Sequence, residues 1–561
     1  MTALSAAAVT ARQGVALAEV LAPPTVNATW EPVTLSVTQR HDLLDVWTTM
    51  FEDVYVHYSQ KRALYGFDPL RALAALRRQI PFLESAEFLR ELTLLVNRLR
   101  DQHTQLYVDA AAADLTPYVA ALPFLAEVYG PYLTPTYVVT KVTEDLADAR
   151  PDADTDFGVG ARLTTWNGVP FGRTVDLYAE TLTGGRPDAR RARALETLTQ
   201  RPLQYLPPPD ELWVDIGYRL ADDPEGAPDR TIRLEWRAIA PAKAITADNL
   251  IALRTRRAID ATSEAARRAR KLLFATALWD TDDANRPAAK ADDWIPTTFA
   301  DAISARRIRT SHGTFGYLRL WTFDVDSTHR YVEAVADVLR QLPRKGLIID
   351  LRSNPGGVID ATEQLLQLFV PKAIAPARFA LRATPAIATM AGADGNGADL
   401  ADWADSTRLA HELGEEFSQH LPISSSDSFA DRSRVYRGPV VAVVNANTFS
   451  CGDLFAAGIA DYRIGQVVSV GEATGAGGAN VWTSDDIEYA YHAAKLPLAD
   501  IPPGIGFTVS VRRMTRSGQA AGLAVEDIGV SGDERYDMTE TDLTDGNTDL
   551  AEFCTRLLIS T

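Results

Sequence analysis

The stretch Gly438–Asp461, GPVVAVVNANTFSCGDLFAAGIAD, is the part of this chain that says most about its fold. Its first part, Val440–Val444, is a short apolar run rich in β-branched residues, which is typical of a strand buried on both faces. A turn follows at Asn445–Thr448, and Leu454–Ile459 then has the character of a packed helix. The stretch therefore predicts a buried strand, a turn and a helix in direct succession.

Ser450 stands where the predicted turn becomes the helix. A hydroxyl at this place gains from free backbone N–H groups and from the positive end of the helix dipole, the environment that an oxyanion needs. The segment TFSCG at 448–452 also comes within one residue of the G-x-S-x-G nucleophile elbow. A simpler interpretation is open at this point, because Ser450 and Asp453 have the spacing of a helix-capping pair.

Length, composition and charge narrow the class of protein. A chain of 561 residues suggests roughly three or four domains. Its 46% hydrophobic and 23% charged residues are ordinary for a globular protein with an ample core. The net charge of -18 argues against nucleic acid and against anionic membranes as partners.

The chain has no evident metal motif, cofactor motif or targeting segment. Its two cysteines, Cys451 and Cys554, make neither a disulfide framework nor a metal-ligand spacing. The histidines are scattered, without an H-E-x-x-H pair, so neither a metal nor a cofactor is expected. The N-terminus lacks an early basic residue, and no apolar run is long enough for a signal or a membrane span. A cytoplasmic protein is therefore expected.

The sequence pattern changes along the chain and predicts its domains. We expect an N-terminal extension, a helical domain, a β-rich module, a helical linker and an α/β core at 1–40, 41–121, 122–240, 241–302 and 303–561. Within the linker, 280–293 is rich in Asp, Ala and Pro and marks a domain boundary. The core contains an insertion at 372–433 with a predicted turn at 393–397. One role for this insertion is a lid.

The β-rich module resembles a PDZ domain, whose groove takes an extended peptide by strand addition. The segment GARLTTWNGVPF at 160–171 carries this resemblance, with a strand, an Asn-Gly turn and a continuing strand. A structural β-insert without a free groove is the alternative.

A second strand-turn-helix unit begins with the buried strand Leu347–Leu351 and runs into RSNPGG at 352–357. The adjacent Gly356 and Gly357, placed before a helix, leave N–H groups exposed that can cradle an anion. The chain has neither G-x-G-x-x-G nor G-K-S/T, which disfavours a nucleotide site.

Four motifs together resemble peptidase family S41, the tail-specific and C-terminal processing proteases with their tricorn-like relatives. They are DLRSNPGG at 350–357, SCGDLF at 450–455, GEATG at 471–475 and LRDQHT at 99–104. The resemblance covers roughly 40–240 and 305–535. It implies a multidomain α+β protein whose α/β core is of the ClpP/crotonase type. It also implies an ATP-independent serine endopeptidase that acts on unfolded or C-terminal peptide segments.

The resemblance further implies which residues act. The processing-protease branch uses a Lys from the segment after the Ser, but that neighbourhood here is Ala476–Gly478, and the only Lys after Ser450 is Lys495. The tricorn-like branch uses a Ser, a His from an N-terminal helical segment and a late Glu. Ser450, His103 and Glu526 match these three roles.

The chemistry of a triad agrees with this assignment. A serine hydroxyl needs a base, and a neutral imidazole contributes about 10²–10⁴-fold. A carboxylate such as Glu526 then fixes the tautomer and stabilises the imidazolium. Backbone N–H groups of Gly356 or Gly357 and of Cys451 are expected to form the oxyanion hole. Cys451 follows the matched Ser, so its thiol is not the expected nucleophile.

Other functions remain open from the sequence. A serine hydrolase in α/β-hydrolase order would rely on His492, the only His after Ser450. A ligand-binding protein on the same fold would have no turnover. The same triad could also hydrolyse an ester or transfer an acyl group on a small molecule, because a triad alone does not determine which acyl substrate is used. In the favoured interpretation the partner is a peptide or protein substrate, and homo-oligomerisation is left open.

Overall fold

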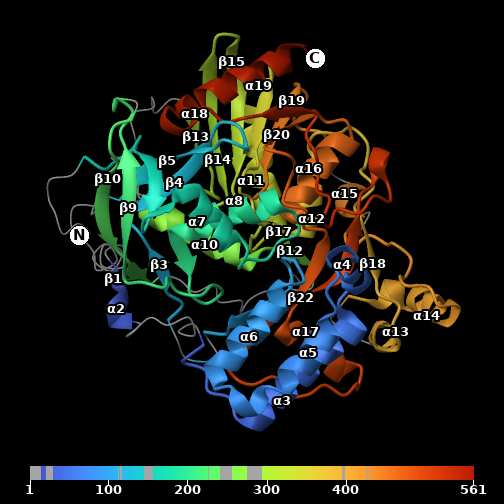
Figure 1. The fold of residues 1–561 in the computed structure, drawn as a ribbon. Helices are drawn as coiled ribbons and strands as arrows, with labels where there is room; N and C mark the ends of the chain where they lie inside the picture. The colour runs from blue at the N-terminus through green and yellow to red at the C-terminus, as the bar shows by residue number, and fades with distance from the viewer. Residues whose placement is uncertain are drawn as a thin grey trace, which may run out of the picture.

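The computed structural model describes residues 14–20, 30–110, 113, 116–143, 156–224, 226–240, 256–274, 293–393, 399–425, 427–430 and 433–560. The expected boundary at 280–293 and the expected turn at 393–397 lie almost entirely outside these residues. The described residues form a multidomain α+β protein with several sheets (Figure 1).

A seven-stranded mixed sheet is the centre of the second half of the chain. In spatial order its strands are β13 (Trp294–Ile295), β14 (Ile303–Thr310), β15 (Gly313–Leu320), β16 (Leu347–Asp350), β19 (Val440–Asn445), β20 (Gln466–Val470) and β23 (Glu534–Tyr536). β14 is antiparallel to both of its neighbours, β13 and β15, and all the pairs from β15 to β23 are parallel. The predicted strand at Val440–Val444 is thus confirmed, in the interior of the sheet.

Helices cover both faces of this sheet. They are α11 (Thr328–Gln341), α12 (Ile359–Gln367) and α16 (Cys451–Asp461) on one face, and α18 (Glu540–Thr544) and α19 (Thr548–Ser560) on the other. On β19, Ala442 and Val444 share a core with Phe455 of α16, whereas Val441 and Val443 pack with α19. Apolar residues on both sides of the strand account for its uninterrupted hydrophobic run.

The N-terminal helical region packs against a second sheet of the core. Its elements are α3 (Val37–Thr49), the π-helical turn η1 (Met50–Val54), α4 (Tyr58–Tyr65), α5 (Pro69–Arg77), η2 (Ile80–Phe82) and α6 (Ser85–Asn97). The second sheet contains β18 (Arg378–Leu381), β22 (Ile505–Thr515), β2 (Gln105–Val108) and β21 (Ala479–Thr483). The rings of Trp47 and Phe507 lie 5.3 Å apart between their centroids, so α3 and β22 share one hydrophobic core. This packing brings the end of α6 to the core.

The β-rich module has a hydrophobic core of its own. One sheet contains β10 (Arg230–Glu235), β9 (Trp213–Arg219), β6 (Arg162–Trp166), β5 (Thr136–Val142), β4 (Phe124–Tyr129) and β7 (Val169–Pro170). A smaller sheet contains β1 (Val15–Ala16), β11 (Arg237–Ile239), β3 (Val119–Ala121) and β8 (Gln200–Pro202), and the helices are α2 (Leu17–Val20), α7 (Phe171–Ala179) and α8 (Pro187–Leu198). Asn167 and Gly168 both have positive φ, as the predicted Asn-Gly hairpin turn requires.

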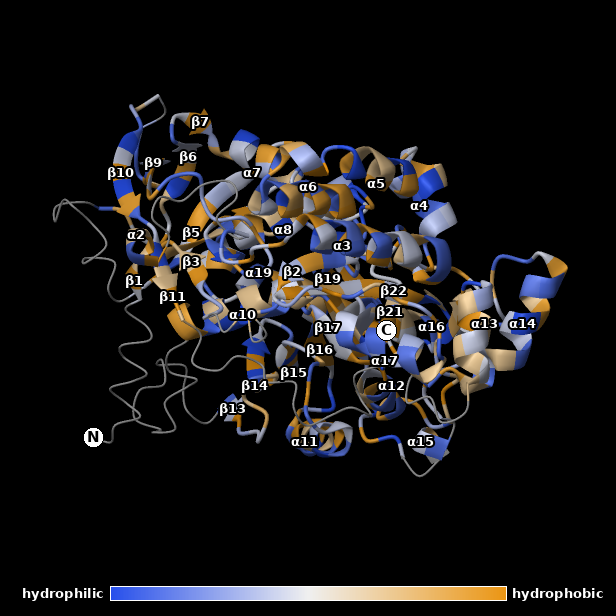
Figure 2. Ribbon diagram, turned by 90° about the horizontal axis from the view of Figure 1, so that it is seen from below, coloured by the Kyte–Doolittle hydropathy of each residue, from blue (hydrophilic) through white to orange (hydrophobic). Residues whose placement is uncertain are grey.

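Two further segments complete the described chain. The strand β12 (Arg257–Ile259), which precedes α10 (Ala261–Phe274), pairs with β17 (Gly356–Val358). The insertion forms β18 and the helices α13 (Pro385–Gly392), η7 (Ala401–Trp403), α14 (Ala404–Leu413) and α15 (Asp427–Ala430), and η8 (Gly518–Ala520) follows β22. In Figure 2, α13 and α14 extend away from the other elements. Among the described helices, none has the length and apolar character needed to cross a membrane.

Candidate active site

Ser450 is presented by a strained turn at the head of α16. Its φ of 62° and ψ of -114° lie in a region that residues other than glycine rarely adopt. Its Oγ is 2.7 Å from Nε2 of His103, and both side chains are buried. The Asp453 carboxylate accepts the Ser450 N–H at 2.6 Å. The capping interpretation is therefore incomplete, because the serine hydroxyl lies against an imidazole.

His103 is held in a short turn between α6 and β2. Oδ1 of Asp101 accepts the backbone N–H of His103 at 2.8 Å. Oδ2 of Asp101 accepts the hydroxyls of Thr104 and Ser510 at 2.9 and 2.8 Å. The His103 ring packs on Phe449, with centroids 4.6 Å apart. These contacts anchor the imidazole on β22 and beside the residue that precedes Ser450.

The environment of His103 keeps its imidazole neutral. Burial lowers the pKa of His103 to about 4, although the charges of Asp101 and Asp260 act in the opposite direction. At neutral pH the ring can therefore accept a proton. Its Nδ1 has no hydrogen-bond partner within the part of the chain that the structure describes.

Glu526 is buried nearby but forms its contacts with other groups. Its Oε1 is 2.6 Å from Nζ of Lys61. Its Oε2 accepts the N–H of Gly478 at 2.9 Å and lies 3.7 Å from Nε2 of His57. Burial raises the pKa of Glu526, and the Lys61 charge opposes that rise. The structure thus brings Ser450 and His103 together, whereas the contacts found for Glu526 do not include His103.

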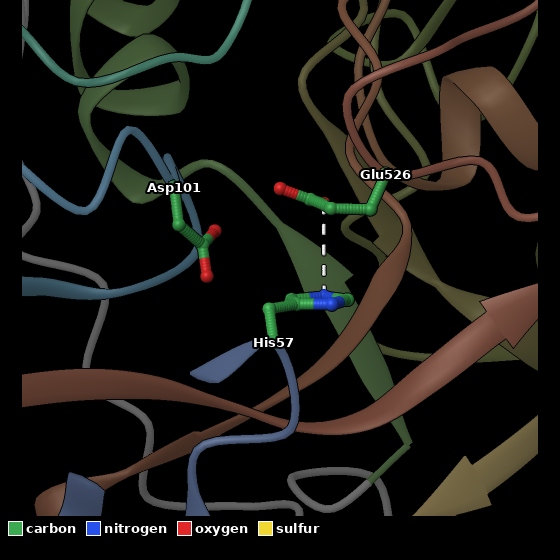
Figure 3. A group of neighbouring side chains, drawn as sticks. All are labelled: His57, Asp101 and Glu526. Carbon is green, nitrogen blue, oxygen red and sulfur yellow. Dashed lines mark ion pairs between the residues drawn. The ribbon is translucent and has the colours of Figure 1, made fainter. Parts of the chain in front are cut away.

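His57, Asp101 and Glu526 form a buried cluster. Figure 3 shows the three side chains turned toward one another, and each offers a ligand atom within 4.8 Å of the others. Burial lowers the pKa of His57 to about 3, so its ring is neutral. Such donors suit a cation, but the ammonium of Lys61 already brings a positive charge to Glu526. An ammonium in this position disfavours a metal ion there.

The Ser450 turn is connected to Glu526 through a glycine-rich loop. Besides the Ser450 N–H, the Asp453 carboxylate accepts the hydroxyl of Thr474 and the N–H groups of Ala476 and Gly477, both at 3.0 Å. The next N–H, that of Gly478, binds Glu526. Burial raises the pKa of Asp453 to about 6, and these four donors act against the rise. The segment where one branch of the family carries a Lys is therefore a structural loop here.

The expected oxyanion-hole residues lie beside Ser450. A Cβ on Gly356 would meet Cβ of Ser450 at 2.8 Å and the Cys451 nitrogen at 3.1 Å. The Gly356 N–H itself donates to Oδ1 of Asn354 at 2.9 Å, and Gly357 pairs with Ala258 of β12. Cys451 is the first residue of α16, where N–H groups have no acceptor within the helix.

The chemistry of the Cys451 thiol differs from that of a nucleophile. Burial raises its pKa to about 12, so the thiol stays protonated.

The alternative bases lie elsewhere. His492 is in the last turn of α17 (Ser484–Ala493) and is exposed, as is Lys495 just after that helix. Ser450 is paired with His103 instead, so the geometry opposes the α/β-hydrolase order.

Sequence reasoning missed Lys61 and His57, which contact Glu526 from the N-terminal region. The rarity of lysine among the many basic residues was the one signal that could have drawn attention to Lys61.

Part of the chain matches a known protein family. Residues 314–502 match the family described as peptidase family S41. No curated protein matches the sequence.

Structures of mature CPAF share the fold of this chain. Mature CPAF is 15% identical, with a TM-score of 0.62 over 93% of this chain and 98% of that one. Mature CPAF complexed with lactacystin is 15% identical, with a TM-score of 0.61 over 94% and 99% of the two chains. The photosystem II D1 C-terminal processing protease is 15% identical over 90% and 94%, with a TM-score of 0.39. The CPAF structures show that nearly the whole chain adopts a known arrangement.

Proposed function

We propose that this chain is an ATP-independent serine endopeptidase, with Ser450 as nucleophile and His103 as base; the match of residues 314–502 to peptidase family S41 supports this proposal. Unfolded or C-terminal peptide segments are the proposed substrates. The observation that carries the proposal is the 2.7 Å separation between Ser450 Oγ and His103 Nε2. This is hydrogen-bond distance, at which a base can take the hydroxyl proton.

The reaction follows from this pair. His103 Nε2 accepts the proton as Ser450 Oγ attacks the peptide carbonyl carbon, and the imidazolium then gives the proton to the leaving amine. Water hydrolyses the resulting acyl-enzyme with the same base. The Cys451 N–H at the head of α16 is the proposed oxyanion donor, and Gly356 and Gly357 border the same place.

Glu526 is the proposed acid of the triad. Its carboxylate is buried and shares a cluster with Asp101, which is two residues from His103 and binds its backbone. In a poorly solvated site a negative charge stabilises an imidazolium without direct contact.

The β-rich module is the proposed site of peptide presentation. A surface hollow lies between the ends of β5 and β6, where these strands pair only at Val138 and Arg162. Unpaired strand edges can accept an extended peptide by strand addition.

Labelling with a fluorophosphonate probe tests the catalytic proposal. Wild type should be labelled, and Ser450→Ala and His103→Ala should not. His492→Ala is the matched control, because this exposed histidine should not affect labelling. A folded wild type that resists the probe would favour the ligand-binding alternative. Loss of labelling in His492→Ala alone would mean that the base is wrong. Cleavage of an unfolded protein, compared with an activated ester, then identifies the acyl group.

A further inference from the structure

The helix α4 presents one face to the segment that carries Glu526. Lys61 and Tyr65 are one helical turn apart on α4 and both contact Oδ1 of Asp527, at 2.7 and 2.9 Å. Gln60 donates to Oδ2 of the same carboxylate at 2.9 Å. The N-terminal helical region therefore contacts two consecutive acids of the α/β core, Glu526 and Asp527.

Lys61 is the centre of this contact. Its ammonium lies 2.6 Å from Glu526 Oε1 and 2.7 Å from Asp527 Oδ1, and it donates to the carbonyl oxygen of Arg100 at 3.0 Å. These three acceptors match its three N–H donors. Its side chain is 2% exposed, so the ion pairs are poorly screened by solvent.

Several charged and titratable groups face Glu526. Asp101 and Asp527 carry like charges, the ring of His57 is neutral, and Lys61 is the positive group in contact. The phenols of Tyr55 and Tyr65 also lie in the field of Glu526. Two neighbouring carboxylates and burial thus favour a protonated Glu526, and Lys61 opposes them.

Lys61 acts on Asp101 as well. Burial would raise the pKa of Asp101, but several contributions, of which the charge of Lys61 is the largest, together outweigh burial and lower the pKa to about 2. Burial alone would lower the pKa of Lys61, but the charges of Glu526, Asp527 and Asp101 together raise it. A single ammonium therefore favours the ionised form of both Asp101 and Glu526.

We propose that Lys61 is a positioning residue of the peptidase, whose ion pair holds the Glu526 carboxylate in place beside His57 and Asp101. This inference rests on the proposed function, because it requires Ser450 and His103 to be the reacting pair. A protonated Glu526 would stabilise the imidazolium less, so proton transfer from Ser450 would slow.

Two variants test the inference with opposite expected signs. Lys61→Met removes the positive charge, which raises the pKa of Glu526. The acid limb of the rate-against-pH curve should therefore shift to higher pH by about 1–3 units. Asp527→Asn removes a negative charge beside Glu526, so the acid limb should shift to lower pH. Asparagine tolerates the φ of 64° at this position.

The measurement is the fluorophosphonate labelling rate of the full chain from about pH 5 to about pH 10. Lys61→Arg keeps the charge and should restore the wild-type profile. Lys141→Met is the matched control, because Lys141 is exposed on β5 and should leave the profile unchanged.

The outcomes separate the inference from the proposed function. The role of Lys61 is supported if wild type is labelled and the acid limbs of Lys61→Met and Asp527→Asn shift in opposite directions along the pH axis. An unchanged profile in folded Lys61→Met, or displacement of both variants in one direction, overturns it. If Lys61→Met does not fold, the Asp527→Asn profile decides, and no downward displacement overturns the inference. An unlabelled wild type instead refutes the proposed function.

Discussion

Replacing Asp453 by asparagine should disrupt the turn that presents Ser450. Oδ2 of Asp453 accepts the N–H groups of Ser450 and Gly477 at 2.6 and 3.0 Å. Oδ1 accepts the Thr474 hydroxyl and the Ala476 N–H. Asparagine keeps one acceptor oxygen and puts an amino group in place of the other, so two of these four donors lose their acceptor.

The magnitude follows from the burial of this network. Asp453 is fully buried, and a buried donor without a partner costs about 1–3 kcal/mol. Two such donors cost about 2–6 kcal/mol, which corresponds to a fall in Tm of roughly 5–20 °C for a domain of about 200 residues. The labelling rate of Ser450 should fall with it, because the strained φ of Ser450 is no longer held by its N–H contact.

Differential scanning calorimetry and fluorophosphonate labelling measure the two effects. Asp453→Glu keeps both oxygens and should retain labelling, at an overpacking cost of about 1–3 kcal/mol. Asp326→Asn is the control, because Asp326 is exposed before α11 and pairs only with Arg330 in the described residues. An Asp453→Asn protein that melts and labels like wild type would refute the reasoning.

Two further predictions concern the β-rich module. Arg193 of α8 forms a buried, bidentate ion pair with Asp260, at 2.6 and 3.2 Å. Arg193→Met leaves Asp260 unpaired and should destabilise the protein by about 3–5 kcal/mol in thermal unfolding, whereas exposed Arg173→Met should not. Thr136→Trp should fill the hollow at β5 and raise KM for a peptide while leaving hydrolysis of a small activated ester unchanged; equal effects on both substrates would contradict peptide presentation.

The sequence was most informative where backbone conformation is local. The apolar run of β19 and the turn before α16 follow from residues that are adjacent in the chain. Gly356 and Gly357 likewise have φ values of 103° and 148°, and a Cβ on Gly357 would lie 2.0 Å from the Phe323 carbonyl carbon. Glycine is required there by sterics alone, so such a motif is visible in any one sequence.

The pairing of His103 with Ser450 was predictable only through family resemblance. His103 and His492 are both single histidines near apolar segments, and nothing local distinguishes them. The packing of α3 and β2 on β22 places His103 next to Ser450, although the two residues are 347 positions apart in the sequence.

The strand, the turn and the glycine pair on the Ser450 side of the site can be predicted from the sequence, because they depend on local sterics and hydrophobic pattern. In contrast, the pairing of Lys61 with Glu526 becomes visible only in the folded protein. The same is true of Nδ1 of His103, which has no hydrogen-bond partner among the described residues. Such pairings depend on how separate regions pack and on how far burial removes water from charged groups. Neither the packing of separate regions nor the extent of burial can be derived from the spacing of residues along the chain.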